Sequence, residues 1–295
     1  MQRIDAHLHV WDPARGDYGW LAGAPSALQR AFSIEEALEV LDESAMQHAV
    51  LVQAAPTLAE TEYLLAIAAR CKRVAGVVGW LPLTGAGDTR RELAMLRGKV
   101  GGVALIGVRP MLQDLSEDAY LLRDEVVDSL SALAHEAQPL VFDALVLPKH
   151  LRVLRAFMDR AERFKRPLTV VLDHLAKPSV ESGSQWRHWR SWVEQLREIA
   201  RCPHAFCKVS GLPAQASAKT SADSFRPYIE AALECFGAER LIWGSDWPVV
   251  TLHSSMQAWQ EAVGACLNQL SQCERDGVFG ANAQRAYSLR SAQLG

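Results

Sequence analysis

The chain has 295 residues, of which 49% are hydrophobic and 22% charged, and its formal net charge is −3. These values are ordinary for a globular enzyme with a sizeable core, and the weak negative charge gives no electrostatic reason to expect nucleic acid or an anionic membrane as a partner. The sequence contains no run of eighteen apolar residues, so we predict no membrane span. It also shows no signal-peptide pattern of basic residues followed by an apolar stretch, so we predict a cytoplasmic location.

Eight short apolar or β-branched runs alternate with longer amphipathic segments from one end of the chain to the other. The expected strands cover residues 3–9, 48–54, 74–80, 100–109, 140–144, 168–174, 205–211 and 241–246. The expected helices cover residues 33–47, 62–71, 89–97, 117–136, 151–164, 186–199 and 224–235, with a long helix after 253 and a last one over 281–289. The first of these helices opens with Ser33 and Glu36, the spacing of a capping box.

This alternation indicates repeated βαβ units and a parallel sheet. Eight units predict an α/β fold that closes into a single-domain (β/α)₈ TIM barrel over residues 1–295, with an open doubly wound sheet as the alternative. In a barrel, the irregular segments that follow the strands build the active site. Here those segments are residues 12–32, 83–88, 177–185 and 212–223.

Two histidines lie on the first expected strand. Side-chain alternation places Asp5, His7 and His9 on one face of it. Ile4, Ala6 and Leu8 lie on the other face, which we expect to contact the outer helices. His7 and His9 then point into the barrel, about 7 Å apart along the strand, where they can converge on one metal ion or one oxyanion.

Two further polar residues end later strands. His174 ends the sixth expected strand and Asp246 ends the eighth, at the carboxyl ends where barrel enzymes keep their catalytic residues. Taken singly, His174 could be a structural histidine at the rim and Asp246 an N-cap. Together with the histidine pair, they predict four metal- or proton-handling groups at one mouth.

The same mouth offers candidates for substrate binding. Arg109 ends the fourth strand, where its guanidinium could bind a carboxylate of the substrate bidentately or could form a structural ion pair. Lys177 follows His174 by three residues and could reach the same mouth. Trp11, Trp20, Trp80 and Trp247 lie near strand ends, and their rings could stack on a sugar ring. Trp11 and Trp247 are the principal candidates among them.

Other conspicuous residues favour structural roles or stay open. Trp243 and the helical series that includes Trp189 and Trp192 are typical of core packing. Lys208 lies inside the seventh strand and either points into the barrel or packs along its outside. The roles of Lys208 and of Asp143 on the fifth strand remain open at this stage.

The motifs as a set resemble the amidohydrolase superfamily. H-x-H at the end of the first strand, a later strand-ending His and an Asp after the eighth strand carry this resemblance. More narrowly, DAHLHVW, VLDHLAKP, CKVSGL, WGSDWPV and NAQRAY resemble the amidohydrolase-related lactonases, which include L-fuconolactone, L-rhamnonolactone and 4-sulfomuconolactone hydrolases, with 2-pyrone-4,6-dicarboxylate lactonase as a relative. The resemblance extends over essentially the whole chain.

The resemblance implies a metal site of His7, His9, His174 and Asp246, but the chain departs from the wider superfamily. Many members place a carboxylated Lys or a Glu on strand four and a His on strand five. This chain has an arginine at the first place and an aspartate at the second, so the bridging ligand of a two-metal site is missing. We expect at most one divalent ion, with zinc the best candidate, and metal-free catalysis is the alternative.

The expected activity is hydrolysis of a small sugar-acid lactone. Asp246 would act as the general base towards water. His7, His9 and His174, with or without one divalent ion, would polarise the carbonyl. The alternatives are another ester or amide hydrolysis, a metal-dependent decarboxylase of the same superfamily, and a non-catalytic barrel that binds a ligand. The sequence does not identify the lactone or the oligomeric state.

Overall fold

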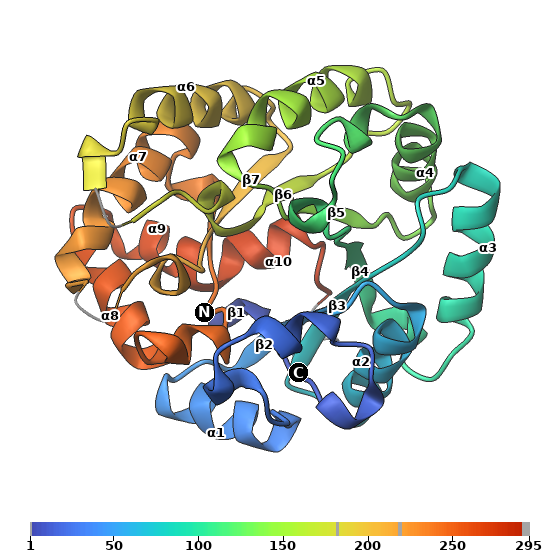
Figure 1. The fold of residues 1–295 in the computed structure, drawn as a ribbon, viewed down its shortest axis with the longest axis horizontal. Helices are drawn as coiled ribbons and strands as arrows, with labels where there is room; N and C mark the ends of the chain where they lie inside the picture. The colour runs from blue at the N-terminus through green and yellow to red at the C-terminus, as the bar shows by residue number, and fades with distance from the viewer. Residues whose placement is uncertain (1, 181–182, 218–219, 291–295) are drawn as a thin grey trace.

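The computed structural model describes residues 2–180, 183–217 and 220–290. Its eight strands form one parallel sheet in chain order, and Figure 1 shows them ringed by helices. The strands are β1 (Ile4–Leu8), β2 (His48–Val52), β3 (Val74–Gly79), β4 (Leu105–Val108), β5 (Val141–Ala144), β6 (Val170–Leu172), β7 (Ala205–Val209) and β8 (Leu241–Trp243). The predicted (β/α)₈ barrel is confirmed, and the open-sheet alternative is wrong.

The outer layer consists of one helix after each strand. These helices are α1 (Ile34–Glu43), α2 (Leu58–Arg70), α3 (Ala86–Arg97), α4 (Asp124–Ala134), α5 (Leu151–Ala161), α6 (Trp189–Ala200), α7 (Arg226–Phe236) and α8 (Met256–Cys266). Two short helices follow, α9 (Gln272–Asp276) and α10 (Asn282–Ala286). Among the described residues, no helix is long and apolar enough to cross a bilayer.

Two predicted helix boundaries are wrong for local reasons. α2 begins four residues before the predicted start, because the Thr57 side chain caps it by accepting a hydrogen bond from the Glu60 amide. The helix predicted over 117–136 begins only at Asp124, after a 3₁₀ turn at Tyr120–Leu122. The expected loops 177–185 and 212–223 include residues 181–182 and 218–219, which lie outside the described residues.

The lower part of the barrel interior is an apolar cluster to which every strand contributes. Its strand members are Ile4, Ala6, Val50, Val52, Ala75, Val78, Ile106, Val141, Val171, Phe206 and Ile242. Ile4 and Ala6 therefore face inward, and the predicted orientation of these two residues is wrong. The register of β1 against β2 shifts between Asp5 and Leu8, an irregularity that simple alternation cannot reveal.

The C-terminal segment closes the amino-terminal end of the barrel. Ala283 and Ala286 of α10, with Tyr287 and Leu289 just beyond it, belong to the same inner cluster. The interior is thus filled from below with apolar side chains. Polar side chains occupy the upper interior, at the carboxyl ends of the strands.

Candidate active site

The structure brings together the four groups that the sequence singled out. Nε2 of His9, His7 and His174 lies 3.4, 3.7 and 3.9 Å, respectively, from Oδ1 of Asp246. The Nε2 atoms of His7 and His9 are 3.2 Å apart. His7 lies in β1, and the other three groups follow directly after β1, β6 and β8. The reversal of Ile4 and Ala6 does not displace the histidines, because the irregularity in β1 turns His7 inward above them.

The other ring nitrogens of His9 and His174 are held by neighbours. Nδ1 of His9 is 2.7 Å from the carbonyl oxygen of Val52, and Nδ1 of His174 is 2.9 Å from Oγ of Ser210. Such partners fix both ring orientation and tautomer. The Nε2 atom of each ring is therefore directed towards Asp246.

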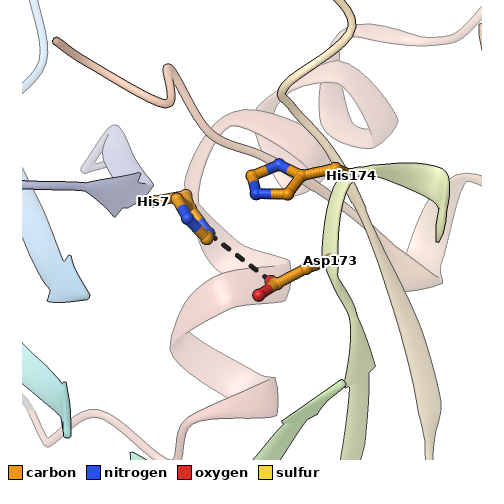
Figure 2. A group of neighbouring side chains, drawn as sticks. All are labelled: His7, Asp173 and His174. Atoms are coloured by element: carbon orange, nitrogen blue, oxygen red, sulfur yellow. Dashed lines mark ion pairs between the residues drawn. The ribbon is translucent and has the colours of Figure 1, made fainter. Parts of the chain in front are cut away.

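His7 is held from below by a buried network of charges. Its Nδ1 lies 3.4 Å from Asp173 and 3.1 Å from Nζ of Lys208 (Figure 2 shows the ion pair with Asp173). Lys208 also contacts Asp173 at 3.0 Å and Asp143 at 2.5 Å, and the Tyr287 hydroxyl donates to Asp143. Lys208 and Asp143, whose roles the sequence left open, therefore point into the barrel. Asp173 was not predicted from the sequence.

His174 lies at the start of a turn whose backbone is left-handed. The residues from His174 to Lys177 all have positive φ angles, between 52° and 61°. Left-handed backbone costs about 1–2 kcal/mol per non-glycine residue and persists where the surroundings enforce it. Gly211 makes room for the turn, because a Cβ at that position would lie 2.4 Å from Nδ1 of His174. Asp246 also has a positive φ, of 60°.

Burial and charge set the ionisation of the site. Burial lowers the pKa of His174 to about 4 and also lowers that of His9. Burial and the Lys208 ammonium lower the pKa of His7. Burial alone would raise the pKa of Asp246, but the three neighbouring imidazoles outweigh it and hold the pKa well below its usual range. Near neutral pH the site therefore holds an ionised carboxylate in contact with three imidazoles.

The two predicted cationic residues both reach the site. Arg109 is buried: its guanidinium donates to the backbone oxygen of Gln53 and lies 3.6 Å from Asp173. Its position between β2 and β6 is thereby fixed. Nζ of Lys177 donates to Oε1 of Gln113 at 2.6 Å. Burial lowers the pKa of this lysine.

A cavity of about 280 Å³ opens over these groups. It is lined by His9, Trp11, Trp20, Ala54, Arg109, Met111, Gln113, Asp114, Leu145, His174, Lys177, Ala214, Gln215, Asp246, Val249 and Leu252. Polar groups are gathered around Asp246 and Lys177, and much of the remaining wall is apolar. The members that sequence reasoning missed lie mostly on irregular loops, where periodicity gives no signal.

The two predicted tryptophans differ in their relation to the cavity: Trp11 lines it and Trp247 is not among the described residues that do. Trp11 touches the cavity, but it is buried and its indole donates to the carbonyl oxygen of Arg30 at 2.9 Å. Trp20, which was not among the principal candidates, presents a 37% exposed side chain to the same cavity. Trp247 is not among the described residues that line it, and its ring packs on Phe32 at a centroid distance of 5.4 Å.

Comparison with known proteins identifies similar chains. The sequence profile of the family described as Amidohydrolase matches residues 4–289. An L-fucono-1,5-lactonase of Burkholderia ambifaria is 38% identical over 97% of this chain and 96% of its own length. An L-fucono-1,5-lactonase of Burkholderia multivorans is 32% identical over the same shares of the two chains.

A solved structure agrees with these matches. It is an amidohydrolase from Burkholderia multivorans with bound zinc, 31% identical to this chain, with a TM-score of 0.87. The alignment covers 98% of this chain and 100% of that one.

Proposed function

This chain belongs to the amidohydrolase family, and from that premise we propose that it hydrolyses the internal ester of a small sugar-acid lactone. The observation that carries the proposal is the convergence of three imidazole Nε2 atoms on the Asp246 carboxylate at the edge of a cavity. Two relatives that match nearly the whole chain bear the name L-fucono-1,5-lactonase.

The proposed reaction needs one proton acceptor and one group that stabilises an oxyanion. Asp246 is ionised because of its depressed pKa, so it can take a proton from water as the water oxygen attacks the lactone carbonyl. The C–O bond of the ring then breaks, and Asp246 returns the proton to the leaving alkoxide oxygen. The product is a hydroxy acid, whose ionisation releases one proton to the solvent.

His7, His9 and Asp246 fit one divalent ion, because their ligand atoms all lie within 4.8 Å of one another, and Nε2 of His174 lies 3.9 Å from Asp246. Tetrahedral zinc with nitrogen and oxygen ligands at about 2.0–2.2 Å separates neighbouring ligand atoms by about 3.3–3.6 Å. The distances measured here, 3.2 Å between the Nε2 atoms of His7 and His9 and 3.4–3.9 Å from the imidazoles to Asp246, are close to that spacing. When bound, the ion would supply positive charge to the lactone carbonyl.

Substrate binding is assigned to the cavity wall. Lys177 and Arg109 present N–H donors to hydroxyl or ring oxygens. The exposed face of Trp20 suits the less polar face of a sugar ring, a contact that aromatic side chains commonly make. Trp11 contributes a second aromatic side chain to the cavity wall. Trp247 does not line the described part of the cavity, and its ring packs against Phe32.

The decarboxylase alternative receives less support. The family's decarboxylases generally carry a further metal-ligating histidine on strand five, where this chain has Asp143. That carboxylate is engaged by Lys208 and Tyr287, so it is not available to a metal ion or a substrate. A non-catalytic barrel is also disfavoured, because the full histidine and aspartate set is present in contact geometry.

The test is a panel of five- and six-membered aldonolactones, with proton release followed at weak buffering and the zinc content of the enzyme measured. We expect turnover of at least one lactone, and turnover at least about 100-fold slower by Asp246→Asn. Aromatic hydroxy acids are offered in parallel, with release of carbon dioxide as the readout. Release of carbon dioxide without lactone turnover would show that the protein is a decarboxylase. If neither assay shows turnover with zinc supplied, the proposal is rejected.

A further inference from the structure

We infer that Trp192 and Tyr228, on helices outside the barrel, are positioning residues for the left-handed turn that carries His174 and Lys177. This inference rests on the function proposed above. It concerns side chains that do not line the cavity and that sequence reasoning assigned, in the case of Trp192, to core packing alone.

Each of the two residues donates one hydrogen bond to the segment after β6. Nε1 of Trp192, on α6, donates to the carbonyl oxygen of Leu175 at 2.9 Å. The hydroxyl of Tyr228, on α7, donates to the carbonyl oxygen of Ser179 at 2.7 Å. The two carbonyls lie two residues before and two residues after Lys177, so the segment is held on both sides of that lysine.

The turn needs such anchors because its backbone is strained and buried. Four consecutive non-glycine residues are left-handed, and Leu175 and Ala176 are fully buried within them. A buried carbonyl requires a hydrogen-bond partner. Inside the turn, the Lys177 amide donates to the carbonyl of His174, and the indole of Trp192 supplies a partner to the next carbonyl along the chain.

The anchors are themselves rigid. Trp189, Trp192 and Tyr228 form an aromatic cluster whose ring centroids are 5.1, 5.1 and 5.7 Å apart. Aromatic contacts at these separations lock the rings against each other. Burial raises the pKa of Tyr228 to about 12, so its hydroxyl keeps the proton that it donates.

The two anchors should affect different kinetic constants. Leu175 is adjacent to His174, so loss of the Trp192 donor should chiefly displace the imidazole and lower kcat. Ser179 is on the far side of Lys177, so loss of the Tyr228 donor should chiefly loosen that lysine and raise KM. Displacements of about 1 Å at catalytic groups can reduce rates by up to about 100-fold.

The experiment uses Trp192→Phe and Tyr228→Phe, which keep an aromatic ring and remove one donor each. Trp243→Phe is the matched control, because Trp243 is also fully buried but its indole nitrogen has no hydrogen-bond partner among the described residues. We expect faster amide deuterium uptake in residues 173–180 of the first two variants, with the rest of the barrel unchanged. We also expect at least about a tenfold loss of kcat/KM on the best lactone.

Unchanged exchange of residues 173–180 in both variants would overturn the inference, as would an equal effect in the Trp243→Phe control. A uniform rise of exchange over the whole barrel would also overturn it, because that result indicates only lost packing. If the parent turns over no lactone, the proposed function fails, yet the exchange measurement still decides whether these two donors hold the turn.

Discussion

The ionisation of Asp246, on which the proposed mechanism depends, is set by its neighbours. Its carboxylate is buried, which by itself favours the protonated form, but three imidazoles within 3.9 Å reverse that preference. Burial opposes a charge on the same imidazoles: it lowers the pKa values of His174 and His9 and, together with the Lys208 ammonium, that of His7. In the proposed reaction, an ionised Asp246 can accept a proton from water, and the imidazole nitrogens beside it are of the kind that zinc binds.

Asp246→Asn should fold normally and lose at least about 100-fold in kcat, because it keeps the shape of the side chain and removes the proton acceptor. Steady-state kinetics on the best lactone measure the effect. Asp114→Asn, at another carboxylate on the same cavity, is the control and should keep kcat within a few-fold. An Asp246→Asn enzyme with half of the parental rate would reject this residue as the base.

Zinc binding should be limited to one ion per chain and should depend on His9. Removing one nitrogen ligand by His9→Asn is expected to weaken zinc binding at least about 100-fold, more than loss of an outer partner does. Chelator competition and elemental analysis measure affinity and content. His150→Asn, at a buried histidine that contacts Asp118 instead, should leave both unchanged, and two ions per parental chain would contradict the prediction.

Site residues at the ends of strands could be predicted from the sequence. Site residues whose position depends on the geometry of a turn could not. His174 could be predicted because it closes an apolar run. Asp173, one residue earlier, was overlooked because nothing in its spacing distinguishes it from the end of the strand. The strand in fact ends at Leu172, and the following turn directs Asp173 to Lys208 and His7. Trp20 was named with Trp11, Trp80 and Trp247 as a possible stacking residue, but nothing in the sequence favoured it over Trp247.

At the scale of elements, the junction between β8 and β1 carries much of the site. The Asp246 amide donates to the carbonyl of His7, and the His9 amide donates to that of Trp247, both at 2.8 Å. Oδ1 of Asp5 accepts from the amides of His7 and Ser245. The side chain of Asp5 therefore helps to close the barrel at the place where the base and two histidines meet.

Alternation of side chains predicted the strand β1 correctly and the faces of its first residues wrongly. Ile4 and Ala6 point into the barrel because the register shifts before Leu8. A bulge adds one residue without changing composition, so the pattern of apolar residues carries no trace of it. The barrel itself was predictable because each helix lies between two strands and presents its own apolar stripe.

Asp5 makes stability depend on pH. Burial raises its pKa from 3.8 to about 7, so between these values the folded chain holds a proton that the unfolded chain has released. Stability from this group is complete below about pH 4 and falls by about 1.4 kcal/mol per pH unit up to its folded pKa. Asp5→Asn keeps the Oδ1 acceptor and cannot titrate, so it should lose less stability than the parent between pH 5 and 7.

Urea unfolding at pH 5, 6 and 7 measures this difference directly. Because other buried groups titrate in both proteins, the quantity to compare is the free energy of unfolding of the variant minus that of the parent. We expect this difference to rise with pH. A difference that stays constant over the range would show that Asp5 does not titrate there.

At the scale of the whole molecule, the barrel is stacked in layers from closed end to mouth. The C-terminal segment and the inner apolar cluster form the lowest layer. The charged network of Lys208, Asp143 and Asp173 lies above it, and the imidazoles and the cavity lie above the network. Tyr287 links the first two layers, because its ring lies in the apolar cluster and its hydroxyl bonds Asp143.

Tyr287→Phe should therefore reduce stability more than it reduces activity. Loss of a hydrogen bond to a buried charged group costs about 1–3 kcal/mol, whereas Tyr287 lies outside the set of cavity-lining residues. Chemical unfolding and the KM for the best lactone measure the two effects. Tyr120→Phe, on a half-buried ring outside the barrel, is the control. A large rise of KM with unchanged stability would contradict the layered arrangement.

The closed lower end also constrains the order of events in a catalytic cycle. Among the described residues, Tyr287 and the apolar cluster fill the barrel below the charged network, so we expect the cavity to open to solvent at the mouth. The lactone must enter, and the hydroxy acid must leave, through the same opening and past the same Lys177 and Arg109 donors. If the product carboxylate occupies the space that the next lactone requires, we expect inhibition by product to be competitive with substrate.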